Sequence, residues 1–190
     1  AIIIVTMPTR SDLTNAITDA ARRAFSSLFE NHPGCYYYCS LITTGEAHPP
    51  VIAAWSHEAL AATTANAESA ESAQMARRAM KWSYADSPFY CYGEELFESV
   101  NRLFAERPKM NHEMTKENWD SEYQLRIDTM ESAMARLDSE GVFGSGDARL
   151  GTVVLVEVMP PDHSNTDRAL RLNPMAALGE WLAEAAELEE

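Results

Sequence analysis

The sequence lacks the short motifs that mark well-characterised catalytic and nucleotide-binding sites. It has no GxSxG nucleophile elbow, no P-loop and no GxGxxG turn. Gly144-Ser145-Gly146 predicts a turn and not a phosphate cradle, because no helix start with a basic residue follows it. The histidines are scattered, and none pairs with another at the spacing of metal ligands on a helix: His32, His48, His57, His112 and His163. We therefore expect no catalytic residue, no metal and no cofactor.

Long apolar segments and a disulfide framework are also missing. The N-terminal run Ile2-Ile3-Ile4-Val5 is too short for a signal peptide or a membrane span. Met7 is a more natural start, so we expect residues 1–10 to be a leader, with residues 1–6 artificial or misassigned. The odd number of cysteines (Cys35, Cys39 and Cys91) favours a reducing compartment, and we expect the cytoplasm.

Basic charge is scarce. Fifteen lysines and arginines face 29 aspartates and glutamates, which gives a formal net charge of −14, and the acidic excess lies mostly in the last two thirds of the chain. Such a field repels phosphate backbones and anionic membranes, so we expect neither nucleic acid nor membrane as a partner. It favours encounter with a basic partner. The plainer interpretation is that the charge keeps the protein soluble.

Hydrophobic periodicity predicts helices over residues 12–31, 59–80, 94–105 and 115–140. Strands are predicted over residues 35–44, 51–55 and 152–159, the first two as a hairpin. After Pro160-Pro161 a polar loop is expected through His163-Ser164-Asn165, and Asn173 is expected to cap a last helix. The predicted apolar face of that helix contains Met175, Leu178, Trp181, Leu182 and Leu188. No linker or repeat divides the chain, so residues 11–190 are expected to form a single α+β domain.

Two features could carry chemistry or binding. Glu157 interrupts an apolar strand, and burial would raise its pKa and suit it to acid or base catalysis. We favour the plainer interpretation, in which its carboxylate reaches solvent or Arg149. The segment from Trp82 to Tyr92 has five aromatic residues in eleven and could form a pocket or an interface anchor, although local core packing is the plainer interpretation.

Three parts of the chain carry a resemblance to a known family. They are the helix-to-strand segment from Ala20-Ala21-Arg22-Arg23 to Tyr36-Tyr37-Tyr38 with Ser56-His57-Glu58, the Lys81-Trp82-Ser83 element with Phe97 and Asn101, and Gly141-Val142-Phe143-Gly144 with the strand 152–159. Together they resemble the bacterial domain-of-unknown-function 4303 family over most of the chain. Ser87-Pro88-Phe89 departs from the pattern, because a second Trp is common there.

The resemblance implies an α+β fold with an antiparallel sheet, which we expect to have about four to five strands packed with about five helices. It carries over no catalytic residues. It also implies proximity to polymorphic toxin systems, in which members of the family are expected to act as immunity proteins.

Our main hypothesis is therefore an immunity protein that binds a cognate toxin domain with a basic surface and blocks its active site. The expected contacts are three acids of the helix 115–140 (Glu117, Asp128 and Glu131) and an anchor in the aromatic segment (Trp82, Tyr84, Asp86 and Tyr90).

The alternative is an enzyme or small-ligand protein with an aromatic pocket around Trp82 and with Glu157 as acid or base. A structural or regulatory module that self-associates is a third possibility, and the oligomeric state stays open.

Overall fold

The first helix begins at a pair of reciprocal side-chain caps. The computed structural model describes residues 6–189, and α1 (Arg10–Asn31) starts where Thr9 and Asp12 each accept a hydrogen bond from the other's backbone N–H. The helix expected over residues 12–31 is thus confirmed. Residues 1–5 of the expected leader lie outside the described residues, whereas Thr9 and Arg10 belong to the start of α1.

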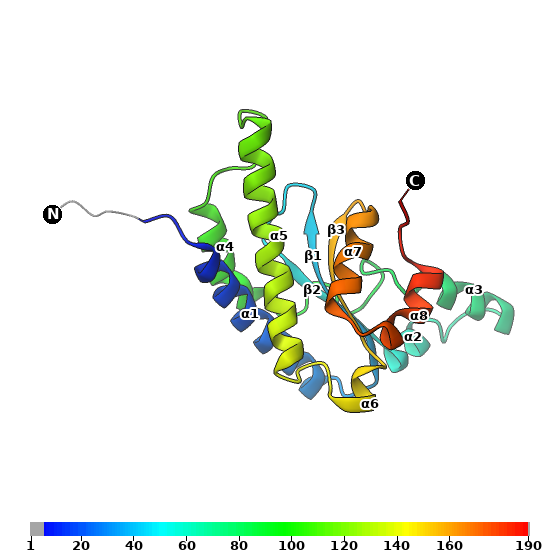
Figure 1. Cartoon of the computed structure of the whole chain (residues 1–190). Coiled ribbons are helices and arrows are strands. Elements are labelled where there is room, and N and C mark those ends of the chain that lie inside the picture. Colours follow the sequence, from blue (N-terminus) through cyan, green and yellow to red (C-terminus); the bar gives the residue numbers. More distant parts are fainter. Residues whose placement is uncertain (1–5, 190) are drawn as a thin grey trace.

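Within the described residues, one mixed sheet lies at the centre of the α+β domain (Figure 1). Its strands are β1 (Tyr36–Thr44), β2 (Val51–Ser56) and β3 (Val153–Met159), in the order β2-β1-β3. β1 and β2 are antiparallel and place Tyr38 beside Trp55, whereas β1 and β3 are parallel and place Cys39 beside Val154.

The described residues contain three strands and eight α-helices, where about four to five strands and about five helices were expected. The expected antiparallel direction holds for β1 and β2 but is wrong for β3, which runs parallel to β1. The reason is the long helical connection from β2 to β3, which brings the chain back beside the start of β1. A strand that re-enters there runs parallel to β1.

The remaining elements are helical. They are α2 (His57–Thr63), α3 (Ala70–Met80), the 3-10 helix η1 (Glu94–Phe97), α4 (Glu98–Ala105), α5 (Lys116–Ser139), α6 (Gly146–Arg149), α7 (His163–Leu172) and α8 (Met175–Glu184). The helix expected over residues 115–140 is confirmed. The one expected over 94–105 is formed by η1 followed by α4, and the one expected over 59–80 is split into α2 and α3.

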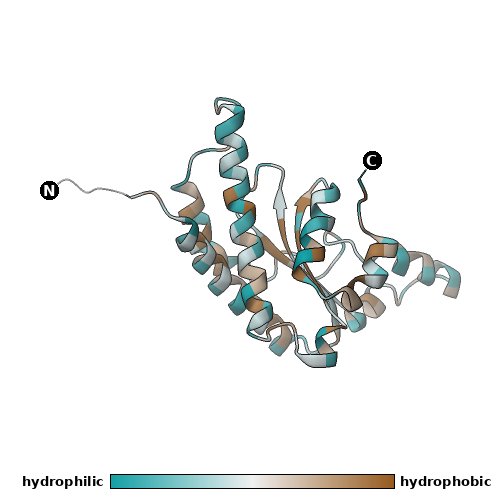
Figure 2. Ribbon diagram, viewed as in Figure 1, coloured by the Kyte–Doolittle hydropathy of each residue, from teal (hydrophilic) through white to brown (hydrophobic). Residues whose placement is uncertain are grey.

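Alternating side chains of the sheet enter two separate cores, as the period of a strand dictates. On one face, Cys39, Leu41 and Val154 pack against α1 and α5. On the other face, Tyr38 and Leu155 pack against α8 and the segment that contains Trp82. In Figure 2 the strands are largely brown and the outer turns of α3 and α5 largely teal, so the apolar residues lie between the layers.

The C-terminal region differs from its sequence prediction. The expected polar loop after Pro161 is the helix α7, whose N-terminus is capped by Asp162 through a 2.9 Å bond from the Ser164 N–H. Asn173 does not cap the last helix, since Pro174 holds that position. Met175 and Leu188 are 64% and 76% exposed, so the expected apolar face of this helix is narrower than predicted.

Side chains of α7 and its C-terminal end close the outer edge of β3. The Asn173 side-chain amide accepts a hydrogen bond from the Val154 N–H (2.8 Å) and donates one to the Val154 carbonyl (2.7 Å). Asn165 makes the same pair of bonds with Val158, at 2.8 and 3.0 Å. Between them, the Arg168 Nε donates to the Val156 carbonyl at 3.0 Å. These three side chains take the place of a fourth strand.

The outer edge of β2 is covered by the aromatic segment. The Cys91 N–H donates to the Ile52 carbonyl at 2.9 Å, and the Ser87 hydroxyl donates to the Ala54 carbonyl. The Trp55 indole in turn donates to the Ser83 carbonyl at 2.8 Å. The segment is therefore fixed along a sheet edge, where unpaired backbone groups would otherwise invite other strands.

We expect Asn173→Ala to lower the free energy of unfolding by about 2–4 kcal/mol, because it leaves the Val154 N–H and carbonyl buried without partners. Urea denaturation measures the loss. Asn101→Ala, at an exposed position on α4, is the matched control and should change stability by less than about 0.5 kcal/mol. A loss equal to that of the control would show that Asn173 does not hold this edge.

Candidate functional site

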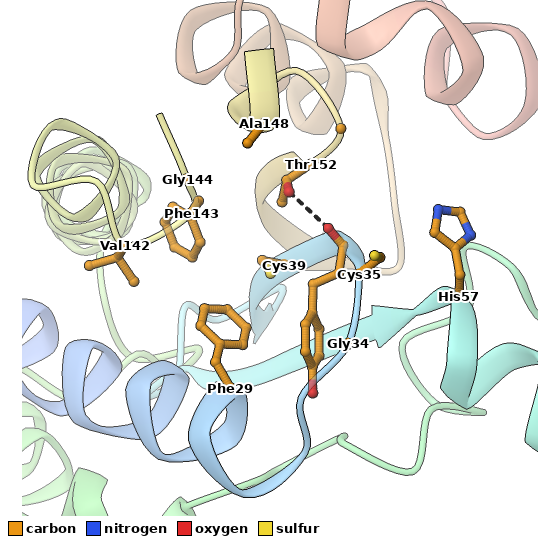
Figure 3. Close-up of a pocket in the computed structure, with 12 residues that line it drawn as sticks. Phe29, Gly34, Cys35, Cys39, His57, Val142, Phe143, Gly144, Ala148 and Thr152 are labelled. Atoms are coloured by element: carbon orange, nitrogen blue, oxygen red, sulfur yellow. Dashed lines mark hydrogen bonds between the residues drawn. The ribbon is translucent and has the colours of Figure 1, made fainter. Parts of the chain in front are cut away.

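A cleft of about 650 Å³ opens where α1, β1, the loop after α5 and α6 meet (Figure 3). Figure 3 shows Phe29, Val142 and Phe143 on one side, Cys35 and His57 on the other, and Thr152 between them. Its lining residues are Phe29, Gly34, Cys35, Tyr36, Cys39, His57, Val142, Phe143, Gly144, Ala148, Gly151 and Thr152. Two of the three segments that carry the family resemblance therefore meet here.

Backbone bonds fix the mouth of this cleft. The Cys35 N–H donates to Glu58 Oε2 at 2.9 Å, and the His57 N–H donates to the Cys35 carbonyl at 3.0 Å. A Cβ at Gly34 would lie 2.7 Å from Glu58 Oε2, so a side chain there would push this carboxylate away from the Cys35 N–H. Between the two sides, the Thr152 hydroxyl donates to the Tyr36 carbonyl at 2.8 Å. The cleft is thus preformed, as ligand sites generally are.

The apolar wall of the cleft rests on the first core. Phe143 is buried and packs edge to face on Phe25, with ring centroids 5.1 Å apart. Phe29 packs on Tyr36 at 4.7 Å. Burial raises the pKa of the Cys39 thiol, and burial with nearby acidic groups raises the pKa of Tyr36 to about 12, so both stay neutral at physiological pH.

Glu157 is buried, and the expectation that its carboxylate reaches solvent or Arg149 is wrong. It accepts a hydrogen bond from the Tyr38 hydroxyl, which lies on the neighbouring strand. Burial raises the pKa of Glu157, and the bond from Tyr38 offsets only part of that effect.

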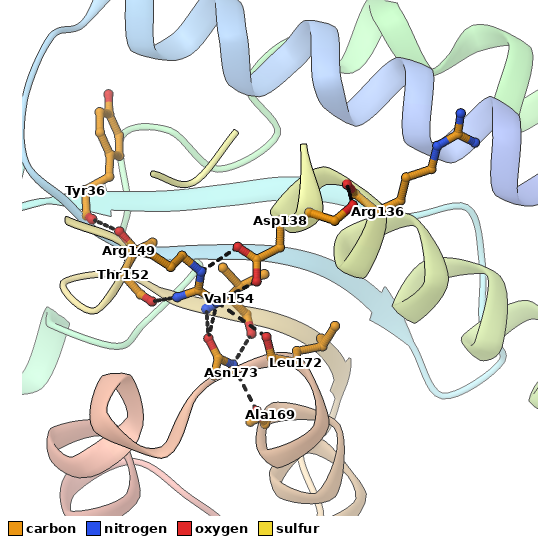
Figure 4. A network of polar contacts seen from close by, with 10 residues as sticks. Tyr36, Arg136, Asp138, Arg149, Thr152, Val154, Ala169, Leu172 and Asn173 are labelled. Carbon is orange, nitrogen blue, oxygen red and sulfur yellow. Dashed lines mark hydrogen bonds and ion pairs between the residues drawn. The ribbon is translucent and has the colours of Figure 1, made fainter. Parts of the chain in front are cut away.

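Arg149 bonds to residues other than Glu157 (Figure 4). Its Nε donates to Asp138 Oδ1 at 2.5 Å, its Nη1 to the Thr152 carbonyl at 2.6 Å and its Nη2 to Asn173 Oδ1 at 3.0 Å. The buried guanidinium therefore joins the end of α5 to the start of β3 and the end of α7.

The aromatic segment is partly packed and partly exposed. Trp82 packs edge to face on Tyr37 at 5.4 Å and donates to Glu184 Oε2 at 2.9 Å. Tyr84 and Tyr90 pack edge to face at 5.2 Å, Tyr90 is 42% exposed, and Asp86 is exposed. A groove of about 600 Å³ lies beside Trp82 and is lined by Gln74, Arg77, Arg78, Lys81, Trp82 and Glu184. Glu157 does not line it, so this groove does not join Trp82 to the buried acid.

The acids expected on α5 are not equally available. Glu117 is exposed. Asp128 pairs with Arg10 at 3.2 Å, and Glu131 pairs with Arg171 at 2.7 Å. In addition, α5 covers the face of the sheet opposite to the one against which Trp82 packs, so the structure does not bring the two sets of predicted contacts together.

Sequence reasoning missed a second acidic feature. Glu94, Glu95 and Glu98 line a groove of about 430 Å³ with Pro50, Val51, Phe97 and Asn101, beside the start of β2. Ion pairs among the described residues include none of these three carboxylates. Their close spacing at a helix start could have signalled a shared surface.

The described residues contain no group of three His, Cys, Asp or Glu side chains placed to hold a metal ion. None of their helices is long and apolar enough to cross a membrane.

The pattern of one family matches residues 17–174, and that family is described as "Domain of unknown function (DUF4303)". The chain belongs to this family. No curated protein and no solved structure matches it. The expected resemblance is therefore confirmed over most of the DUF4303 chain. The match includes every residue that lines the cleft, and all those that line the Trp82 groove except Glu184.

We expect the thiols to differ sharply in reactivity. Cys35 is exposed, whereas Cys39 is buried with a raised pKa. Iodoacetamide at pH 8 should label Cys35 within minutes and leave Cys39 unlabelled until the protein unfolds. Peptide mass spectrometry in native buffer and in urea checks this. Equal labelling of both thiols in native buffer would contradict the buried position of Cys39.

Glu157 should make stability depend on pH. Because its pKa is raised above 4.5 in the fold, the native state keeps a proton that the unfolded chain releases, and the free energy of unfolding falls as pH rises through this window. Glu157→Gln should remove this slope. The variant should match the parent near pH 4 and be more stable by the order of 1 kcal/mol above the window. Denaturation curves across this pH range measure it, and identical slopes would show that Glu157 is already ionised in the fold.

Proposed function

We propose that this protein acts by binding another protein, and that its partner is a bacterial toxin domain with a basic surface. The DUF4303 member would sit over the toxin's active site in the cytoplasm and exclude the substrate. The toxin as partner follows from the family resemblance, whereas the polarity of the interface follows from the charges described next. A stable complex of this kind buries about 1,600 Å² in total.

The first support is where the basic side chains are used. Most of them are held in ion pairs within the molecule. The paired residues are Arg10, Arg22, Lys81, Arg107, Lys116, Arg126, Arg136, Arg149 and Arg171. Arg168 is buried and bonded to a carbonyl of β3. The net charge of −14 is therefore expressed mainly by surface carboxylates that no basic side chain offsets.

The observation that carries the proposal is the groove of Glu94, Glu95 and Glu98. All three residues line one groove together with the apolar residues Val51 and Phe97. A cluster of one sign in a concave surface concentrates the field and speeds association with a partner of opposite sign. This makes the η1 and α4 region a better candidate contact than Asp128 and Glu131, which are already paired.

A kinetic comparison of two triple variants tests this proposal. Replacing Glu94, Glu95 and Glu98 by Gln should slow association with the toxin domain encoded beside this gene by about tenfold at low salt. The dissociation rate should change little. The control replaces Glu68, Glu71 and Asp167 by their amides and removes the same charge. These residues are exposed and lie before α3, on α3 and on α7.

Surface plasmon resonance at several salt concentrations gives both rates. Equal slowing by the two triple variants would show that total charge matters and this groove does not. An association rate that ignores salt, or no binding by the parent protein, would refute the proposed function itself.

A further inference from the structure

The cleft beside Phe143 leaves an apolar concavity open on the surface. Its volume of about 650 Å³ lies within the range of sites that enclose a bound group. Phe29, Val142 and Phe143 form its wall, and the buried Cys39 lies at its base. A preformed concavity of this size with a mainly apolar lining is the usual form of a site that takes up a small group.

The polar groups around the cleft are mostly committed within the protein. The Tyr36 hydroxyl donates to the His32 carbonyl at 2.8 Å, and the Thr152 hydroxyl donates to the Tyr36 carbonyl. The His57 ring packs on Tyr37 with centroids 4.7 Å apart. No Asp, Glu, Lys or Arg is among the residues that line the cleft. The lining therefore offers no counter-charge to a charged metabolite, whereas it suits an apolar side chain.

One ionised carboxylate lies beside this apolar lining. Glu58 accepts the Cys35 N–H, and hydrogen bonds from its own N–H and that of Cys35 lower its pKa, so it is ionised. The exposed Glu30 and Asp147 adjoin the lining residues Phe29 and Ala148 in sequence, and the ion pairs of the described residues include neither. The occupant that fits is thus apolar at its tip, with a basic group beside it that can meet Glu58.

We propose that the cleft beside Phe143 receives one large apolar side chain from a basic segment of the partner protein. This inference rests on the proposed function and adds the anchor to the electrostatic contact. Two copies of this chain, each with a charge of −14, repel one another, which favours a different protein over a second copy as the occupant. Anchors of this kind act mainly on the dissociation rate, because they are seated after encounter.

Filling the cleft tests the anchor separately from the charge. Ala148 is exposed on α6 and lines the cleft, so Ala148→Phe occupies it without disturbing the core. The variant should weaken binding to the toxin domain by about tenfold or more, mainly through faster dissociation. Its salt dependence should stay that of the parent. Ala61→Phe, at an exposed position on α2, is the matched control and should bind as the parent does.

A second measurement uses the protein with an unfilled cleft. Cys35 lies at the mouth and is exposed, so a benzophenone attached to it in a Cys91→Ser background reports on the occupant. Illumination of the complex should cross-link an apolar residue within a basic segment of the toxin domain, as identified by mass spectrometry.

Three results would overturn this anchor while leaving the proposed function intact. They are parental binding by a folded Ala148→Phe variant, cross-links confined to polar or acidic parts of the toxin, and a small molecule that copurifies in the cleft and is lost on Ala148→Phe. If the parent protein fails to bind the toxin at all, the proposed function falls and the anchor falls with it.

Discussion

A sheet with one interior strand leaves the outer hydrogen-bonding groups of its other two strands to be satisfied by something that is not a strand. Here side-chain amides and a guanidinium serve β3, while a hydroxyl and a backbone N–H serve β2. This requirement places α7 against one edge and the aromatic segment against the other. The aromatic segment in turn positions α8, because Lys81 and Trp82 bond to Glu184 at the end of this helix.

The two candidate contact surfaces lie outside these closed edges and use different physics. The groove of Glu94, Glu95 and Glu98 acts at a distance through charge, and ions screen it. The cleft beside Phe143 acts only on contact, through removal of apolar area from water. If both surfaces act in one complex, charge attracts the partner first and the cleft then binds its apolar side chain. Buried ionic groups, such as Arg149 with Asp138, hold the elements that carry both surfaces in place.

Local sequence patterns predicted the elements that depend on interactions between residues close in sequence. The hairpin of β1 and β2 and the amphipathic helices followed from periodicity. Helix α7 was not predicted, because its buried side includes Asn165, Arg168 and Asn173 at its end. Their polar atoms bond to β3, and the local pattern of residues 163–172 does not reveal that partner. The burial of Glu157 was not predicted for the same reason, since its hydrogen-bond partner Tyr38 lies 119 residues away in the sequence. The cleft is assembled from separate apolar pieces, and only the family resemblance pointed to several of them.

The parallel pairing of β1 with β3 has a consequence for synthesis on the ribosome. The hairpin of β1 and β2 emerges early. The strand that pairs with the other side of β1 is β3, which ends at Met159, and Asn173 closes the outer edge of β3. Until those residues leave the exit tunnel, one side of β1 stays open in the nascent chain. Contacts of such long sequence separation form slowly, so this interval is when a chaperone would be most needed.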